Sequence, residues 1–268
     1  MAKNKGTNGR GKSAISQTAE FVEGVGEVVE TLVPHKKLLI VFGVIAAAGL
    51  LGYAVFNWQI NKDRAEASSM YAEALRLSYL PVEEKVEGEQ ATLGLRPESF
   101  ETATARDEAV LATLDSLKSK YGDSGVYEKG RFLHASTLVR LGKYDQASAL
   151  YQSIAGSSDG KSRMSALEGH AFVDELKAEA SADEGGREAN LESALKKYDA
   201  LADAYANAPS ADASGRGSGD YHAGRMLAAL GKNKEAIARF ERALEVEPDS
   251  ALKTTIEERL DVLRRASN

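Results

Sequence analysis

Hydrophobic and polar positions change their pattern sharply along this chain. Residues 38–58 form an uncharged apolar run, whereas charged residues recur at helical spacing before and after it. An α-helix rises about 1.5 Å per residue, so the run would extend roughly 30 Å, the thickness of a bilayer hydrocarbon core. The pattern predicts a single transmembrane helix at 38–58.

A cleaved signal peptide is the alternative interpretation of this run. Its apolar region would be shorter, about 7–15 residues, and would follow closely behind a compact basic start. Here 37 residues precede the run and include four Glu residues. Ala46, Ala47 and Ala48 leave a cleavage site open, but we expect a retained helix with Tyr53 and Trp58 near its outer end. A lipoprotein anchor is excluded because the chain has no Cys.

Basic residues on the two sides of the run predict its orientation. Six precede it and three lie in the first twenty residues beyond it; they are Lys3, Lys5, Arg10, Lys12, Lys36 and Lys37, against Lys62, Arg64 and Arg76. Loops rich in Lys and Arg stay on the cytoplasmic side of a membrane. We therefore expect a single-pass protein of a bacterial inner membrane, with a cytoplasmic N-terminus and a periplasmic domain at 59–268.

The segment before the run has two parts. Residues 1–17 begin with a Gly-, Asn- and Lys-rich stretch and are expected to form a disordered cytoplasmic tail. Residues 18–34 carry Val, Phe and Leu on one helical face and Glu on the other, and Pro34 ends the pattern. This amphipathic cytoplasmic helix would either lie solvated near the membrane or dock a cytoplasmic protein, since its acidic face disfavours anionic lipid.

Charge divides at the same boundary. Residues 1–58 carry a net charge of +2, and the total of −6 leaves −8 for residues 59–268. An acidic domain without a basic cluster makes nucleic acid an improbable partner. Ala, Leu, Glu and Lys are abundant and β-branched runs are scarce outside 38–58, which favours an all-α domain.

Two segments of this domain superimpose on a Leu-Gly-Lys tripeptide. Residues 128–154 and 217–243 each read as an amphipathic helix, a turn at Gly142 or Gly231, and a second helix. That second helix carries Ala, an aromatic residue and a small or apolar residue at spacings of four and three; they are Ala147, Tyr151 and Ile154, and Ala236, Phe240 and Ala243. Pro248 follows the second copy. Such repetition predicts stacked helix pairs.

The remaining sequence is expected to complete the array. A third copy aligns Gly169 with the small residue of a first helix, and Ala194, Tyr198 and Leu201 with a second helix, around an inserted loop at 178–188. A degenerate first unit would pair residues 59–78 with 101–121 across a loop at 79–100. Residues 251–265 resemble the capping helix that a solenoid end requires. The membrane helix has no Gly or Pro from Tyr53 to Leu80 and should continue to about Ser78.

These residues resemble the tetratricopeptide repeat, with its small residue, turn Gly, Ala, aromatic residue and closing Pro. The expected fold is therefore all-α, with a single transmembrane helix followed by a tetratricopeptide-like α-solenoid and a C-terminal capping helix. The order of parts, together with "SALKTTIEERLDVL" near the end, resembles the ancillary subunits of the bacterial Sec translocon. That resemblance implies protein partners: the translocation channel, periplasmic chaperones or exported polypeptides. The alternative is a structural scaffold in an envelope machine for motility, secretion or cell-wall assembly.

The repeat resemblance places first-helix side chains along a peptide-binding groove. The set is basic and aromatic within an acidic domain and would suit extended acidic or C-terminal peptide segments. The alternative is a solvated face that is basic without function; in either case Arg225 is expected at the surface. The predicted groove residues are Lys129, Phe132, Ser136, Arg140, Arg163, His170, Asp174, Tyr221 and Arg225.

Catalytic patterns are weak in this chain. "AGSSDGKS" at 155–162 approaches a phosphate-binding loop, but its first Gly is one position late and no buried strand precedes it. The four His residues lack metal spacing, and we expect surface or packed His side chains in helices. No enzyme activity, cofactor, metal ion or small-molecule substrate is expected.

Overall fold

The computed structural model describes residues 36–82, 99–156, 160–208 and 215–266. The tail predicted at 1–17, the helix predicted at 18–34 and most of the loop predicted at 79–100 lie outside the described residues. The chain divides into two compact units, Met1–Asp63 and Arg64–Asn268. Each unit is described by itself below.

Helix α2 (Lys36–Ser78) contains the apolar run and has 43 residues. It continues without interruption to Ser78, which confirms the prediction made from the absence of Gly and Pro. In the first unit its large apolar side chains from Ile40 to Trp58 are 56–70% exposed. Exposure of so many apolar groups in water is unfavourable. The helix is long and apolar enough to cross a membrane.

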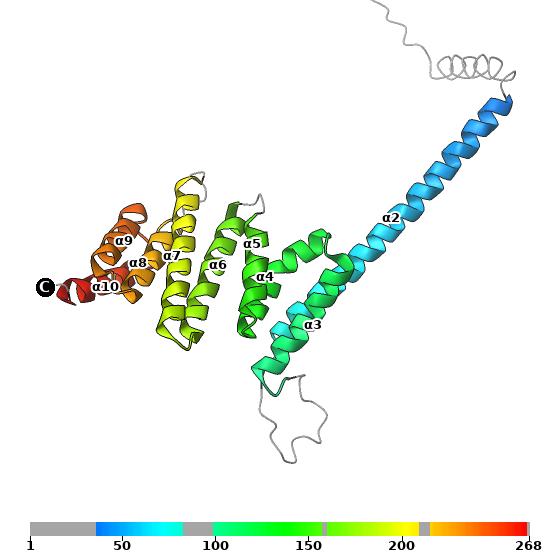
Figure 1. The fold of residues 1–268 in the computed structure, drawn as a ribbon. Coiled ribbons are helices and arrows are strands. Elements are labelled where there is room, and N and C mark those ends of the chain that lie inside the picture. Colours follow the sequence, from blue (N-terminus) through cyan, green and yellow to red (C-terminus); the bar gives the residue numbers. More distant parts are fainter. Residues whose placement is uncertain (1–35, 83–98, 157–159, 209–214, 267–268) are drawn as a thin grey trace, which may run out of the picture. The chain divides into compact units, whose positions relative to one another are not determined.

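The described part of the second unit is built of helices that pack on their neighbours in sequence (Figure 1). After the last part of α2 they are α3 (Ala103–Tyr121), α4 (Gly125–Arg140), α5 (Tyr144–Ala155), α6 (Gly160–Ala180), α7 (Glu184–Ala206), α8 (Ser218–Ala229), α9 (Asn233–Val246) and α10 (Lys253–Ala266). Three pairs follow one another: α4 with α5, α6 with α7, and α8 with α9. We call α4, α6 and α8 the first helices and α5, α7 and α9 the second helices.

Glycine turns join the helices of the first and third pairs, as predicted. Gly142 and Gly231 have φ values of 68° and 74°, a left-handed conformation that disfavours residues with a Cβ atom. The amides of the following lysines, Lys143 and Lys232, donate to the carbonyls of Leu138 and Leu227, both at 2.9 Å. This arrangement ends the first helix and turns the chain into the second.

The middle pair is longer than the others, and the loop predicted at 178–188 is wrong. Helices α6 and α7 have 21 and 23 residues, and only residues 181–183 separate them. The Gly-Gly sequence suggested a loop, yet it lies in the first turn of α7. There the Asp183 carboxylate accepts the amide N–H of Gly186 at 2.8 Å. This N-cap stabilises a helix start that contains two glycines.

Buried clusters run through the described helices of the second unit. Ala67 and Ala74 of α2 pack with Val110 and Leu114 of α3. These two helices are therefore paired, as expected for the first, degenerate repeat of the array. At the other end Ile256 and Leu260 of α10 are buried against the cluster that contains Phe240 of α9. The predicted capping helix is therefore confirmed.

Candidate functional site

In the third helix pair a contact between a small residue and an aromatic ring sets how closely the two helices pack. In the third pair a Cβ atom added to Gly224 would lie 2.9 Å from the ring of Phe240, in the second helix of the same pair. Phe240 is only 1% exposed. Only a small residue at position 224 therefore allows α8 and α9 to approach this closely.

A different residue of α8 meets the ring of the preceding pair. His222 stacks on Tyr198 of α7, with ring centroids 4.8 Å apart and an interplanar angle of 15°. His222 precedes Gly224 by two residues. Helix α8 therefore contacts α9, in its own pair, at Gly224, and α7, in the preceding pair, at His222.

Gly169 occupies the position of His222, not that of Gly224. A Cβ atom added to Gly169 would lie 2.6 Å from the ring of Tyr151, which belongs to α5 in the preceding pair. Ala171, two residues later, is fully buried in the same cluster as Tyr198. The predicted alignment of Gly169 with the small residue is therefore wrong by two residues. The lengthened middle pair lacks the turn glycine that fixes the alignment elsewhere.

The predicted residues of α4 lie on one side of that helix. Lys129 is exposed, and Phe132 is half-buried with its ring 6.4 Å from that of Tyr151. The Ser136 hydroxyl donates to the carbonyl of Leu133, and Arg140 Nε donates to Asp107 Oδ2 at 2.9 Å.

The predicted residues of α8 are more enclosed. Tyr221 is 7% exposed. Arg225 pairs with the buried Glu175 of α6, and its Nη1 also lies 2.8 Å from His222 Nδ1. Arg225 is thus not a free surface side chain, contrary to the expectation from sequence.

The predicted residues of α6 lie on a different side of that helix from the one that corresponds to Phe132 and Tyr221. Arg163 is exposed, and the pKa of the half-buried His170 is lowered, chiefly by burial. Asp174 is 4% exposed and pairs with Lys197 Nζ at 2.6 Å. The corrected alignment matches Asp174 with Leu138 and Leu227, which are also buried.

The corrected alignment instead matches Phe172 with Ser136 and Arg225, and Glu168 with Phe132 and Tyr221. Phe172 is 43% exposed. Two contacts place α6 and α8 side by side here: Ser218 Oγ donates to Glu168 Oε1 at 3.2 Å, and Arg225 pairs with Glu175. We call this surface the first-helix face; its members are Lys129, Phe132, Ser136, Glu168, Phe172, Tyr221 and Arg225.

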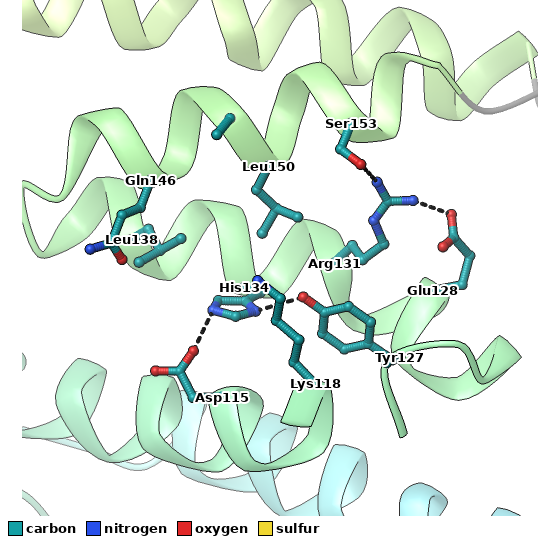
Figure 2. A pocket seen from close by; sticks show the side chains of 12 residues that line it. Asp115, Lys118, Tyr127, Glu128, Arg131, His134, Leu138, Gln146, Leu150 and Ser153 are labelled. Atoms are coloured by element: carbon teal, nitrogen blue, oxygen red, sulfur yellow. Dashed lines mark hydrogen bonds and ion pairs between the residues drawn. The ribbon is translucent and has the colours of Figure 1, made fainter. Parts of the chain in front are cut away.

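A pocket of about 590 Å³ lies elsewhere, between α3, α4 and α5 (Figure 2). At its floor His134 is 2% exposed and bridges two helices, with Nε2 3.2 Å from Asp115 Oδ1 and Nδ1 3.1 Å from the Tyr127 hydroxyl. Burial lowers the pKa of His134 and raises that of Tyr127. A neutral His134 then accepts a hydrogen bond from the Tyr127 hydroxyl at Nδ1 and donates one from its Nε2–H to Asp115 Oδ1. The packed state of His134 agrees with the expectation for the His side chains, but the pocket is not visible in the sequence, because its lining comes from three helices.

In the other two helix pairs, ion pairs occupy the position that corresponds to this pocket. Leu150 lines the pocket in the first pair, and Lys197 and Arg239 stand at the equivalent positions of α7 and α9. Lys197 pairs with Asp174, and Arg239 lies 2.6 Å from Asp199 and 2.8 Å from Asp220.

The pocket contains no activated nucleophile among the described residues that line it. The Ser153 hydroxyl accepts a hydrogen bond from Arg131 at 2.7 Å, and Arg131 also binds Glu128 at 2.6 Å (Figure 2). The two ring nitrogens of His134 are occupied by Tyr127 and Asp115, so this histidine does not serve Ser153 as a base. Within the described ranges no three His, Asp or Glu side chains converge to hold a metal ion.

One family model matches the third helix pair. The family model described as "Tetratricopeptide repeat" matches residues 221–250, which cover most of α8 and α9. No curated protein matches the chain. Among solved structures, a thermophilic TPR protein of Thermus thermophilus, TTC0263, is 16% identical, with a TM-score of 0.43, over 62% of this chain and 77% of its own. YrrB, described as a TPR protein with an unusual peptide-binding site, is 16% identical, with a TM-score of 0.24, over 58% of this chain and 86% of its own. The third helix pair thus carries a tetratricopeptide-repeat match.

Proposed function

We propose that this protein is a membrane-anchored interaction subunit that holds polypeptide segments of its partners on the first-helix face. The observation that carries the proposal is Phe172, a large aromatic side chain that is 43% exposed in the middle of this face. An aromatic ring that is exposed on a rigid helix provides apolar contact area at little conformational cost. The tetratricopeptide match at 221–250 supports a protein partner.

The apolar part of α2 supports the anchor. Its exposed side chains between Ile40 and Trp58 would be buried in lipid, and the segment is long enough to cross a bilayer core. The six basic residues before the span against three after it favour a cytoplasmic N-terminus. The interaction domain would then lie in the periplasm of a bacterial cell.

The partners in this proposal are components of protein export. The order of tail, span and helix pairs resembles the ancillary subunits of the Sec translocon, so the domain would work beside the translocation channel, with periplasmic chaperones or emerging polypeptides. A rigid array of helix pairs would equally suit a scaffold that holds fixed partners. The two roles differ in the diversity of the segments that reach Phe172.

Photo-crosslinking in cells tests this function. Benzoylphenylalanine replaces Phe172 in one full-length variant and Lys196, an exposed residue of α7, in a matched control. We expect crosslinks from position 172 to the translocation channel and to many exported polypeptides, with few from position 196. A small constant set of partners from position 172 would favour the scaffold, and equal crosslinking from both positions would contradict the proposal.

A further inference from the structure

A notch of about 370 Å³ lies between α8, α9 and α10, next to the first-helix face. Apolar side chains form much of its lining: Ala228, Phe240, Val262 and Leu263. Val262 is 66% exposed, which is unusual for a branched apolar side chain in a helix of this unit. The notch therefore offers apolar surface that the chain itself leaves uncovered.

Arg259 stands at the rim of this notch and supplies the positive charge that a ligand would meet there. Its guanidinium lies 6.0 Å from the centroid of the Tyr221 ring, a cation–π contact that orients it over the first-helix face. Arg225 approaches the same ring at 5.9 Å, but its charge is matched by Glu175. Among the described residues Arg259 has no hydrogen bond or ion pair, so its donors are available to a ligand.

A second cation is available at the other end of the same face. Lys129 of α4 is exposed and has no ion pair within the described part of the chain. Between Lys129 and Arg259, Arg225 pairs with Glu175, and Glu168 Oε1 lies 3.5 Å from His222 Nε2, a contact that is an ion pair only when His222 is protonated. One terminal carboxylate could match only one of the two cations, whereas an acidic segment could match both.

Glu258 lies on the notch lining beside Arg259 and is exposed. Its carboxylate would repel an acidic side chain placed deeper in the notch. An aliphatic side chain can enter there without this penalty, while the acidic neighbour remains at Arg259. Glu258 and Arg259 together therefore set where the partner's side chains lie: the aliphatic one inside the notch and the acidic one at Arg259.

We infer that this notch anchors an aliphatic side chain of an acidic partner segment, and that Arg259 binds the acidic side chain next to it. The inference rests on the proposed binding of polypeptides at the first-helix face and specifies their chemistry. A guanidinium gives directional hydrogen bonds to a carboxylate, and the notch adds apolar burial.

Peptide binding to the full-length protein in detergent micelles tests the inference. The probes are two fluorescein-labelled peptides with amidated C-termini, one with Leu-Glu-Glu groups in a Gly-Ser spacer and its twin with Gln in place of Glu. Fluorescence anisotropy should show that the acidic peptide binds at least about fivefold more tightly than its twin. A free C-terminal carboxylate on the twin should not restore the affinity; full restoration would overturn the assignment to an internal acidic side chain.

Matched variants locate the binding. Arg259→Gln should weaken the acidic peptide at least about fivefold, while Arg265→Gln, at an exposed arginine of the same helix outside the notch, changes it less than about twofold. Val262→Asp should weaken the peptide as well, and Glu258→Gln should strengthen it. Equal effects of the two arginine variants would overturn the inference.

The outcome also separates this inference from the proposed function. Loss of binding in Phe172→Ser but not in Arg259→Gln would leave the first-helix face as the binding surface and remove the notch. Absence of binding by the acidic peptide would overturn the notch assignment, while crosslinking from position 172 judges the proposed function independently. The mass of the protein in solution tests a further outcome. If this mass rises with protein concentration, and Val262→Asp lowers it, the notch binds a second copy of the chain, against the inference.

Discussion

Single residues in this protein show how buried charges are matched between helices. Each buried carboxylate among the described residues of the second unit lies against a basic side chain of another helix; the contacts are Asp107 with Arg140, Asp174 with Lys197, Glu175 with Arg225, and Asp220 with Arg239. Such pairs add little net stability, but removal of one partner leaves an uncompensated charge. They therefore favour one alignment of the helices that they join, within a pair for Asp174 and Asp220 and between pairs for Glu175.

Arg225→Ala should destabilise the second unit by about 2–3 kcal/mol, less than the loss for a fully buried pair because the Arg225 side chain is 26% exposed. Glu175, whose side chain is 6% exposed, would lose its counter-charge. Denaturant unfolding measures the change. Addition of Glu175→Gln to the variant should recover part of the loss; a loss below about 0.5 kcal/mol in Arg225→Ala would instead match a surface residue.

Acidification should weaken the fold through two histidines, the buried His134 and the half-buried His170. Burial lowers the pKa of His134 and of His170 below the value of about 6.5 that an unfolded chain has. Below that value the unfolded state binds more protons, so the free energy of unfolding falls as pH falls, by at most about 1.4 kcal/mol per pH unit for each histidine. Unfolding at pH 7.5 and 5.5 measures this slope.

Substitutions assign the slope to particular groups. His134→Gln should reduce it, since one titrating group is gone. Asp115→Asn should make it steeper, because Asp115 raises the pKa of His134 against the effect of burial. A slope that stays the same in both variants would contradict the role given to His134.

At the scale of elements, the sequence predicted each helix pair where a turn glycine marked it. Gly142 and Gly231 located the first and third pairs, and the repeated Ala and aromatic positions identified the buried sides of α5 and α9. The middle pair has no such marker. Gly169 and Ala171 are both small, and only the ring that each one meets in space tells them apart.

Gly142→Ala should cost about 1–2 kcal/mol, because an alanine would have to adopt the left-handed conformation at a φ of 68°. A Cβ atom there would meet no other atom within 4 Å, so backbone strain is the whole cost. Gly125→Ala is the matched control, since Gly125 is helical and also has open space. Denaturant unfolding compares them; equal stability of the two variants would contradict the turn assignment.

At the scale of the whole molecule, the sequence predicted the class of fold and the apolar helix, but not the site. The run at 38–58 is visible in composition alone, and the repeats predict stacked helices. Phe172 was missed because its exposure depends on the alignment of α6, which the sequence left two residues out of place. The pocket near His134 was missed because three helices contribute to it.

The proposed topology predicts where each end of the chain lies. Alkaline phosphatase, which is active only outside the cytoplasm, should be active when fused after Asn268 and inactive when fused before Met1. The reason is the excess of basic residues on the N-terminal side of the apolar run. Enzyme activity in cells carrying each fusion is the measurement, and the reverse pattern would remove the periplasmic placement.

We propose that the exposed Phe172 ring holds partner polypeptides on the first-helix face. Benzoylphenylalanine at Ser136, the equivalent position on α4, reports occupancy of this face without altering position 172. The decisive measurement is the yield of crosslinks from position 136 in cells, with Phe172 intact and with Phe172→Ser. The proposal predicts that the yield falls at least about fivefold while the free energy of unfolding changes by less than about 0.5 kcal/mol. An unchanged yield would contradict it.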